Sequence, residues 1–186
     1  MNRREFCVLP LILTGCGGSD VEYPLQASPT RTGDTLHSDV PGYAKQLWTP
    51  GLTFSTPGDL SVVYTTTLGK YVQVGSLIIA FFTIIVGSWT YMTGSGILRL
   101  TGLPFPAELI PGTNIAWSSG NSYWAGINPT NGYTDLMPRI PGAVSYCELI
   151  MSGDAQASVE TITATHVPSA NTFVLGGVIL YLAQLT

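Results

Sequence analysis

The segment from residue 76 to residue 91 limits the fold of this chain more than any other. It is apolar at almost every position, and as a strand it divides into two apolar faces. One face carries Leu77, Ile79, Phe81 and Ile85, and the other carries Ile78, Phe82, Ile84 and Val86. A sheet with one face in water alternates apolar with polar residues. This strand must therefore be covered twice, once by the core of its own domain and once by a partner.

Strand and turn signals continue through the rest of the chain from residue 46. The expected strands cover residues 48–55, 61–67, 70–74, 76–91, 97–101, 113–118, 122–127, 143–151, 158–165 and 173–183. Turn residues separate them, including Leu68-Gly69 and Gly120-Asn121. No stretch keeps a helical period, so the pattern predicts an all-β fold, an antiparallel β-sandwich or jelly roll. Gly176-Gly177, inside the last strand, indicates a bulge or a close backbone approach.

Residues 1–45 have a different character. Pro24, Pro29 and Pro41 interrupt the segment from residue 17 to residue 45, and its few apolar residues follow no period. Such a segment builds no core of its own. We expect an extended N-terminal docking arm over residues 1–45 and a β-sandwich domain over residues 46–186. A disordered tail is the alternative.

Charge and hydropathy limit the classes of partner. Only 10% of the residues are charged, against about a quarter in a typical soluble protein. The seven basic residues form no patch and the net charge is -4, so nucleic-acid binding is not expected. Low charge on a chain of positive mean hydropathy predicts a surface buried against other protein, as in an obligate oligomer or a lattice.

Membrane attachment is suggested only near the N-terminus. Arg3 and Arg4 precede the apolar run 6–13, and Leu13-Thr14-Gly15-Cys16 resembles a lipoprotein signal that would lipidate Cys16. The apolar run is short and contains Pro10, which argues against this interpretation. The run from Leu77 to Val86 has about half the roughly 20 residues of a membrane-spanning helix. A membrane partner is therefore not expected.

Several blocks between residues 60 and 107 resemble a known module. They are Tyr64-Thr65-Thr66, Gly69-Lys70-Tyr71, Val74-Gly75, Thr93-Gly94-Ser95-Gly96, Leu98-Arg99-Leu100-Thr101-Gly102 and Leu103-Pro104-Phe105. Together they are similar to a β-sandwich module of tailed-bacteriophage virion proteins, among them tail-fibre tips, head fibres and capsid-decorating proteins. The resemblance implies a homotrimer with a structural or attachment role in the virion, assembled in the host cytoplasm, and no catalysis.

The two-faced strands suggest where copies of the chain would meet. The predicted oligomer interface consists of Leu77, Ile79, Phe81, Ile84, Val86, Val178 and Leu180. The second predicted partner, contacted through residues 1–45, is the major capsid protein or another protein of the virion shell or tail.

The sequence shows little sign of reaction chemistry. His37 and His166 have no cysteine or carboxylate at a metal-ligand spacing, and Cys7, Cys16 and Cys147 form no metal or disulfide pattern. Cys147 is read as a buried strand residue. We therefore expect no enzyme activity, catalytic residue, metal or cofactor.

One stretch could bind a ligand. It carries aromatic rings beside amides, the combination that grips a sugar. The candidate glycan-binding residues are Trp117, Tyr123, Trp124, Asn128 and Tyr133. The favoured alternative makes Trp117 and Trp124 plain core.

Three functions remain open. The first is a trimeric capsid decoration, cement or head-fibre protein anchored by its arm, preferred because the chain is short. The second is a short tail fibre or receptor-binding tip that recognises a host glycan. The third is a surface protein lipid-anchored at Cys16.

Overall fold

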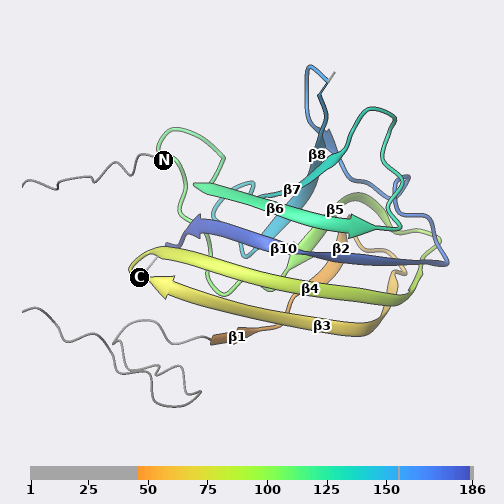
Figure 1. Cartoon of the computed structure of the whole chain (residues 1–186), viewed down its shortest axis with the longest axis horizontal. Coiled ribbons are helices and arrows are strands. Elements are labelled where there is room, and N and C mark those ends of the chain that lie inside the picture. The colour runs from red at the N-terminus through yellow and green to blue at the C-terminus, as the bar shows by residue number, and fades with distance from the viewer. Residues whose placement is uncertain (1–45, 155, 185–186) are drawn as a thin grey trace, which may run out of the picture. The chain divides into compact units, whose positions relative to one another are not determined.

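The computed structural model describes residues 46–154 and 156–184. The docking arm over residues 1–45 and the lipidation at Cys16 lie outside the described residues. Within them the chain forms ten strands (Figure 1). These are β1 (Gln46–Trp48), β2 (Gly51–Thr56), β3 (Ser61–Val74), β4 (Leu77–Thr90), β5 (Ser95–Thr101), β6 (Ser118–Ala125), β7 (Asp135–Arg139), β8 (Tyr146–Ser152), β9 (Glu160–Thr161) and β10 (Asn171–Leu182).

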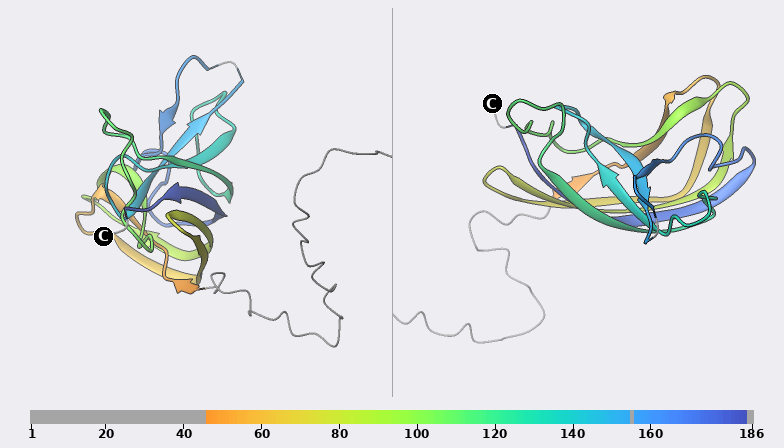
Figure 2. Two further views of the ribbon diagram at one scale, coloured as in Figure 1. Left: turned by 90° about the vertical axis from the view of Figure 1, so that its left-hand side faces the viewer. Right: turned by 90° about the horizontal axis from the view of Figure 1, so that it is seen from above.

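All ten strands belong to one antiparallel sheet. Nine follow the order β1-β3-β4-β10-β6-β7-β8-β5-β2, and β9 pairs with β8 beside this path. The sheet curls, so that β5 and β2 lie behind β3, β4 and β10 (Figures 1 and 2). The predicted all-β antiparallel class is confirmed. The two facing layers come from a single sheet folded over one core.

The first strand of the β3–β4 hairpin, β3, is longer than predicted. Val74 pairs with Leu77 across the turn, and Gly75 there has a φ of 60°, a conformation that glycine adopts without a steric cost. The turn expected at Leu68-Gly69 is wrong, because β3 runs straight through it. Gly69 instead lies directly under the Trp48 side chain of β1, where a Cβ would collide with the indole.

Three further strand predictions are corrected. The separate strands expected at 113–118 and 122–127 are replaced by β6, which is continuous through Gly120-Asn121. Gly120 faces Pro138 of β7, which leaves no room for a side chain. The strand β7 was not predicted; it contains Pro138, a residue that is rare inside strands. The strand expected at 158–165 is reduced to the two residues of β9 and one isolated bridge at Thr163.

The core lies on the inner face of the curl. Its buried side chains come from both halves of the sheet and include Ile78, Phe82, Ile84, Val86, Leu98, Leu100, Leu149, Met151, Leu175 and Ile179. Trp89 packs edge-on against Phe54, at 5.2 Å between ring centroids, and against Phe173, at 5.4 Å. Cys147 is fully buried on β8, as predicted, and burial raises the pKa of its thiol. In the part of the chain that is described, no helix has the length and apolarity to cross a membrane.

The core position of Ile84 and Val86 corrects the predicted interface. Both are almost completely shielded from solvent within this one chain. They point to the inner face of β4, opposite to Leu77, Ile79 and Phe81. A surface on the outside of the sheet therefore cannot include Ile84 or Val86.

Candidate functional site

The outer face is here the side of β3, β4, β10 and β6 that points away from the core. Strand register places its side chains in rows across the four strands. The rows are Val74-Leu77-Leu182, Val72-Ile79-Leu180-Ser119, Lys70-Phe81-Val178-Asn121, Leu68-Thr83-Gly176-Tyr123 and Thr66-Ile85-Val174-Ala125. Five predicted interface residues, Leu77, Ile79, Phe81, Val178 and Leu180, thus lie side by side on this face.

The outer face is apolar and open to solvent. Leu68 is 63% exposed, Phe81 51% and Leu180 37%. Lys70 is the one charged residue in the five rows. Among residues 46–154 and 156–184, the strand that the sequence indicates must be covered twice is thus covered on its inner side alone.

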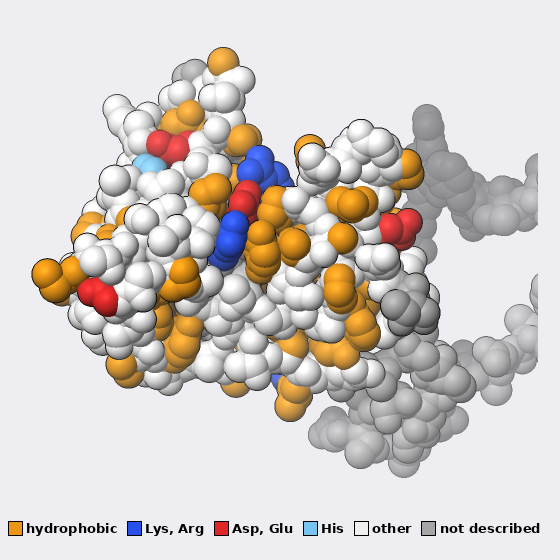
Figure 3. All heavy atoms as spheres, turned by 180° about the vertical axis from the view of Figure 1, so that it is seen from behind, with side chains coloured by type: hydrophobic (Ala, Val, Ile, Leu, Met, Phe, Trp, Pro, Cys, Tyr) orange, Lys and Arg blue, Asp and Glu red, His pale blue; other side chains and the backbone are white. Residues whose placement is uncertain are grey.

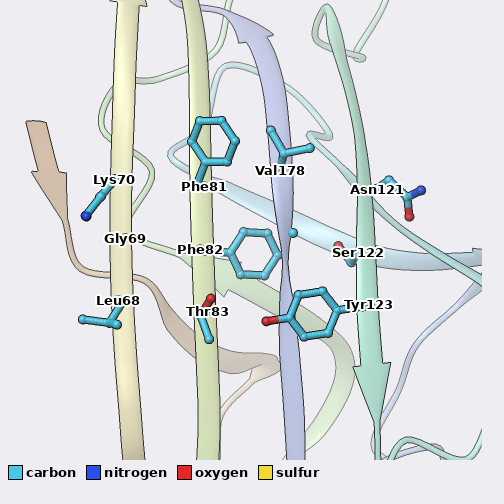
Figure 4. A pocket seen from close by; sticks show the side chains of 11 residues that line it. Leu68, Gly69, Lys70, Phe81, Phe82, Thr83, Asn121, Ser122, Tyr123 and Val178 are labelled. Carbon is cyan, nitrogen blue, oxygen red and sulfur yellow. The ribbon is translucent and has the colours of Figure 1, made fainter. Parts of the chain in front are cut away.

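A shallow groove of about 670 Å³ crosses the middle of the outer face. Leu68 and Phe81 line one side of it, and Tyr123 lines the other (Figure 4). The ring of Tyr123 extends across β10 with its hydroxyl directed toward Thr83. It passes over Gly176, where any Cβ would overlap the ring. Pairing is regular through Gly176-Gly177, so the predicted bulge is absent; the backbone of β6 approaches Gly177, and the Tyr123 side chain lies over Gly176. Tyr123 thus belongs to this surface.

The five candidate glycan-binding residues do not converge. Tyr123 lies on the outer face, whereas its neighbour Trp124 points to the opposite side of β6 and packs against the core. Tyr133, beyond the end of β6, also packs against the core. The exposed Asn128 is placed by its backbone N–H, which donates to the His166 carbonyl at 2.8 Å. Trp117 is 49% exposed, so the core interpretation holds for Trp124 and is wrong for Trp117.

Trp117 lines a second, separate hollow of about 320 Å³. Ile115 and Ile150 supply further apolar walls, and Arg139 supplies the one charged side chain of the lining. This hollow combines an exposed indole with a guanidinium group. Both groups are able to contact a ligand.

Arg139 belongs to a charged row on three neighbouring strands. Glu148 of β8 pairs in register with Arg99 of β5 on one side and with Arg139 of β7 on the other. Its carboxylate lies 2.8 Å from the Arg139 guanidinium and 3.8 Å from that of Arg99. Arg99 stacks over the Tyr146 ring at 4.3 Å. Two basic patches with an acidic one between them are visible in Figure 3.

Sequence reasoning missed this charged row. Glu148 is only 6% exposed, and a buried carboxylate needs a partner of opposite charge. That requirement signals a partner without saying which residue it is. The pairing of β8 with an unpredicted strand, β7, supplies the closer one.

Two further titratable groups, His166 and Asp59, have partners that hold the local fold. The Nδ1 atom of His166 accepts a hydrogen bond from the Thr163 backbone N–H at 3.0 Å, and its Nε2 atom lies 3.4 Å from a Glu160 carboxylate oxygen. Asp59 accepts bonds from the backbone N–H groups of Met92 and Thr93, which hold its pKa well below the usual range. Within residues 46–154 and 156–184, no group of His, Cys, Asp and Glu is arranged to hold a metal ion.

Comparison with known proteins relates this chain to others by fold. No protein-family model matches the sequence, and no curated protein matches it. Among solved structures, the crystal structure of the Dettilon tailspike protein (gp208) is similar, with a TM-score of 0.53 and 18% sequence identity. The match covers 73% of this chain and 23% of the tailspike chain. This chain thus shares a fold with a part of that tailspike protein.

Proposed function

We propose that this chain is a structural protein of a bacteriophage virion, located in the tail and contributing to host attachment. The observation that carries the proposal is the fold likeness to a tailspike protein over 73% of the chain. The sequence blocks between residues 60 and 107, which resemble β-sandwich modules of phage virion proteins, support it independently.

A tail location is preferred to capsid decoration. The sequence favours a decoration or cement role because the chain is short. The similar solved structure is a tailspike, which favours the alternative of a receptor-binding tail component. Residues 1–45 would then connect the β domain to a tail protein, one of the partners expected from the sequence.

The proposed role is binding without catalysis. In its support, polar groups that often carry chemistry are engaged in holding the fold. Glu148 bridges Arg99 and Arg139, and the Cys147 thiol is buried in the core. Host recognition would fall to the second hollow, where Trp117 is exposed and the partly exposed Arg139 guanidinium keeps its pairing with Glu148.

Locating the protein on the particle tests the proposal. Heads and tails separated from purified virions would be analysed by mass spectrometry, and intact virions would be gold-labelled with antibodies against residues 46–186. We expect the chain in the tail fraction and the gold at the tail. Its presence in heads alone would restore the decoration role, and its absence from virions would refute both. The same spectra report whether Met1 is intact, which would exclude a lipidated Cys16.

Host recognition is tested separately. The purified chain should bind host cells and reduce phage adsorption, and Trp117→Ala should abolish both effects with the fold retained. Trp117 is half exposed, so its loss leaves the core intact. Met92→Ala is the control, since Met92 is an exposed apolar side chain in the loop after β4 and lines neither the second hollow nor the outer face. Unchanged binding by Trp117→Ala would remove the second hollow as the receptor site.

A further inference from the structure

We infer that the outer face of β3, β4, β10 and β6 is buried against a second copy of this chain. The inference concerns how the chain associates with itself and does not depend on the proposed function in the virion. It extends the two-faced pattern of the sequence by identifying one surface and its members. Compared with the interface predicted from the sequence, this surface includes Tyr123 and Leu68 and excludes Ile84 and Val86.

The chemistry of the outer face is that of a protein interface centre. Apolar side chains occupy the middle two strands in nearly every row, with the aromatic rings of Phe81 and Tyr123 exposed among them. Interface centres are enriched in aromatic residues and depleted of charged ones. Lys70 is the single charge in these rows, and it stands between Phe81 of β4 and the exposed Leu47 of β1.

The size of the face is at the upper end for a patch on a monomer and approaches one side of a stable interface. The face consists of five rows of side chains, four of which span all four strands and one of which spans three. With rows about 6.7 Å apart and strands about 4.8 Å apart, the flat footprint is about 600 Å². Protruding side chains make the accessible area larger than this footprint. A standard interface buries about 800 Å² per partner, whereas lone apolar patches on monomers reach only about 300–600 Å².

Self-complementarity selects a second copy over a charged partner. A face with one lysine offers no charge pattern for an acidic or basic protein to match. Two copies of the same apolar face need no such match, because each copy shields the apolar side chains of the other from water. The long aliphatic stem of Lys70 lets its ammonium group reach solvent. Either a face-to-face pair or the predicted trimer would bring these faces together.

The test uses the full chain and two substitutions on the outer face. Phe81→Lys and Val178→Lys each place one charge on the outer face, at two positions that are neighbours in the same row. Neither side chain points to the inner face. Sedimentation velocity over a wide range of concentration measures self-association. We expect an oligomer for the unchanged chain and association weaker by about thirtyfold or more in each variant, the effect of losing an interface hot spot.

A matched control separates the face from charge in general. Met92→Lys adds the same charge at a side chain that is 91% exposed in the loop after β4, away from the outer face, and should associate normally. Hydroxyl-radical footprinting of the unchanged chain supplies a readout without mutation. Phe81 and Tyr123 should become protected as concentration rises, while Met92 stays reactive.

Two results would overturn the inference. A monomeric unchanged chain at all concentrations would show that no second copy covers the face. An oligomer that resists both lysine substitutions, with Phe81 still reactive, would place the contact on another surface.

Discussion

Tyr123 of β6 lies with its ring across the backbone of Gly176 in β10, and the ring occupies the space that any Cβ on Gly176 would need (Figure 4). The glycine thus makes room for an exposed aromatic ring on the outer face. The neighbouring Gly177 has a different limit, since a Cβ there would strike backbone atoms of Asn121 and Ser122. The two glycines serve opposite sides of the same strand.

This difference predicts unequal effects of two alanine substitutions. Gly176→Ala should displace the Tyr123 ring, which is free to swing outward, and should change the free energy of unfolding by less than about 1 kcal/mol. Gly177→Ala collides with backbone that cannot move aside, and should cost about 1–3 kcal/mol. Urea denaturation measures both. Gly176→Ala should also weaken self-association in sedimentation, and equal stability losses in the two variants would contradict the assignment of faces.

Two adjacent phenylalanines of β4 should behave in opposite ways. Phe82 is 3% exposed and belongs to the core, so Phe82→Ala should lower the free energy of unfolding by about 3–5 kcal/mol. Phe81 is 51% exposed, so Phe81→Ala should cost under about 1 kcal/mol when protein concentration is low enough to keep copies apart. Denaturation at low concentration tests the pair. Similar losses for both would mean that β4 is not two-faced.

Replacing Glu148, the central residue of the charged row, should lower the free energy of unfolding. Glu148→Gln removes the one negative charge between Arg99 and Arg139 and leaves the two cations facing each other. Because Glu148 is buried while the arginines are partly exposed, we expect a loss of about 2 kcal/mol. Arg99→Gln, at the longer distance of 3.8 Å, is the milder control. A thermal or urea melt in which Arg99→Gln costs more than Glu148→Gln would contradict the 2.8 Å pairing as the main contact.

Asp59 should make stability depend on acid pH. Backbone N–H groups of Thr93 and Met92 lower its folded pKa below the ordinary value of 3.8. The stabilisation from the carboxylate is therefore complete above pH 3.8 and is lost as the pH falls through the lowered folded pKa. Asp59→Asn should melt at a lower temperature at neutral pH, and the difference should narrow below about pH 4. A gap that widens in acid would refute this linkage.

Cys147 should react only when the domain opens. Its thiol is fully buried and burial raises its pKa, so the reactive thiolate is scarce in the folded state. Iodoacetamide labelling followed by peptide mass spectrometry should show Cys147 protected in buffer. Labelling should then rise along the urea unfolding curve. Rapid labelling of Cys147 in the native protein would contradict its core position.

Part of the fold could be predicted because the pattern is local. The alternation in the segment 76–91 is a property of the residues themselves, and the two faces it predicts are those of β4. A glycine is harder to interpret. Gly75 is in a turn, whereas Gly69 and Gly120 are inside strands. Those two strand positions need glycine because Trp48 and Pro138 occupy the space of a side chain. The sequence shows that a side chain is absent and does not show what passes close by.

The candidate site was predictable in the same partial way. Leu77, Ile79, Phe81, Val178 and Leu180 could be assigned to a surface from their apolar alternation alone. The separation of Tyr123 from Trp124 depends on which side of β6 faces the core, and adjacent residues of a strand always diverge. The charged row could not be predicted without β7, and Pro138 within β7 makes that segment look unlike a strand.

The amino-acid sequence by itself determined that the chain is antiparallel β, and that one strand is apolar on both faces, because side chains alternate from residue to residue whatever lies around them. Only the tertiary structure decided which face is the core. The curl of one sheet brings β5 and β8 over Ile78, Phe82, Ile84 and Val86, and leaves Phe81 and its row in solvent. That choice depends on contacts between strands far apart in sequence, which local patterns do not contain.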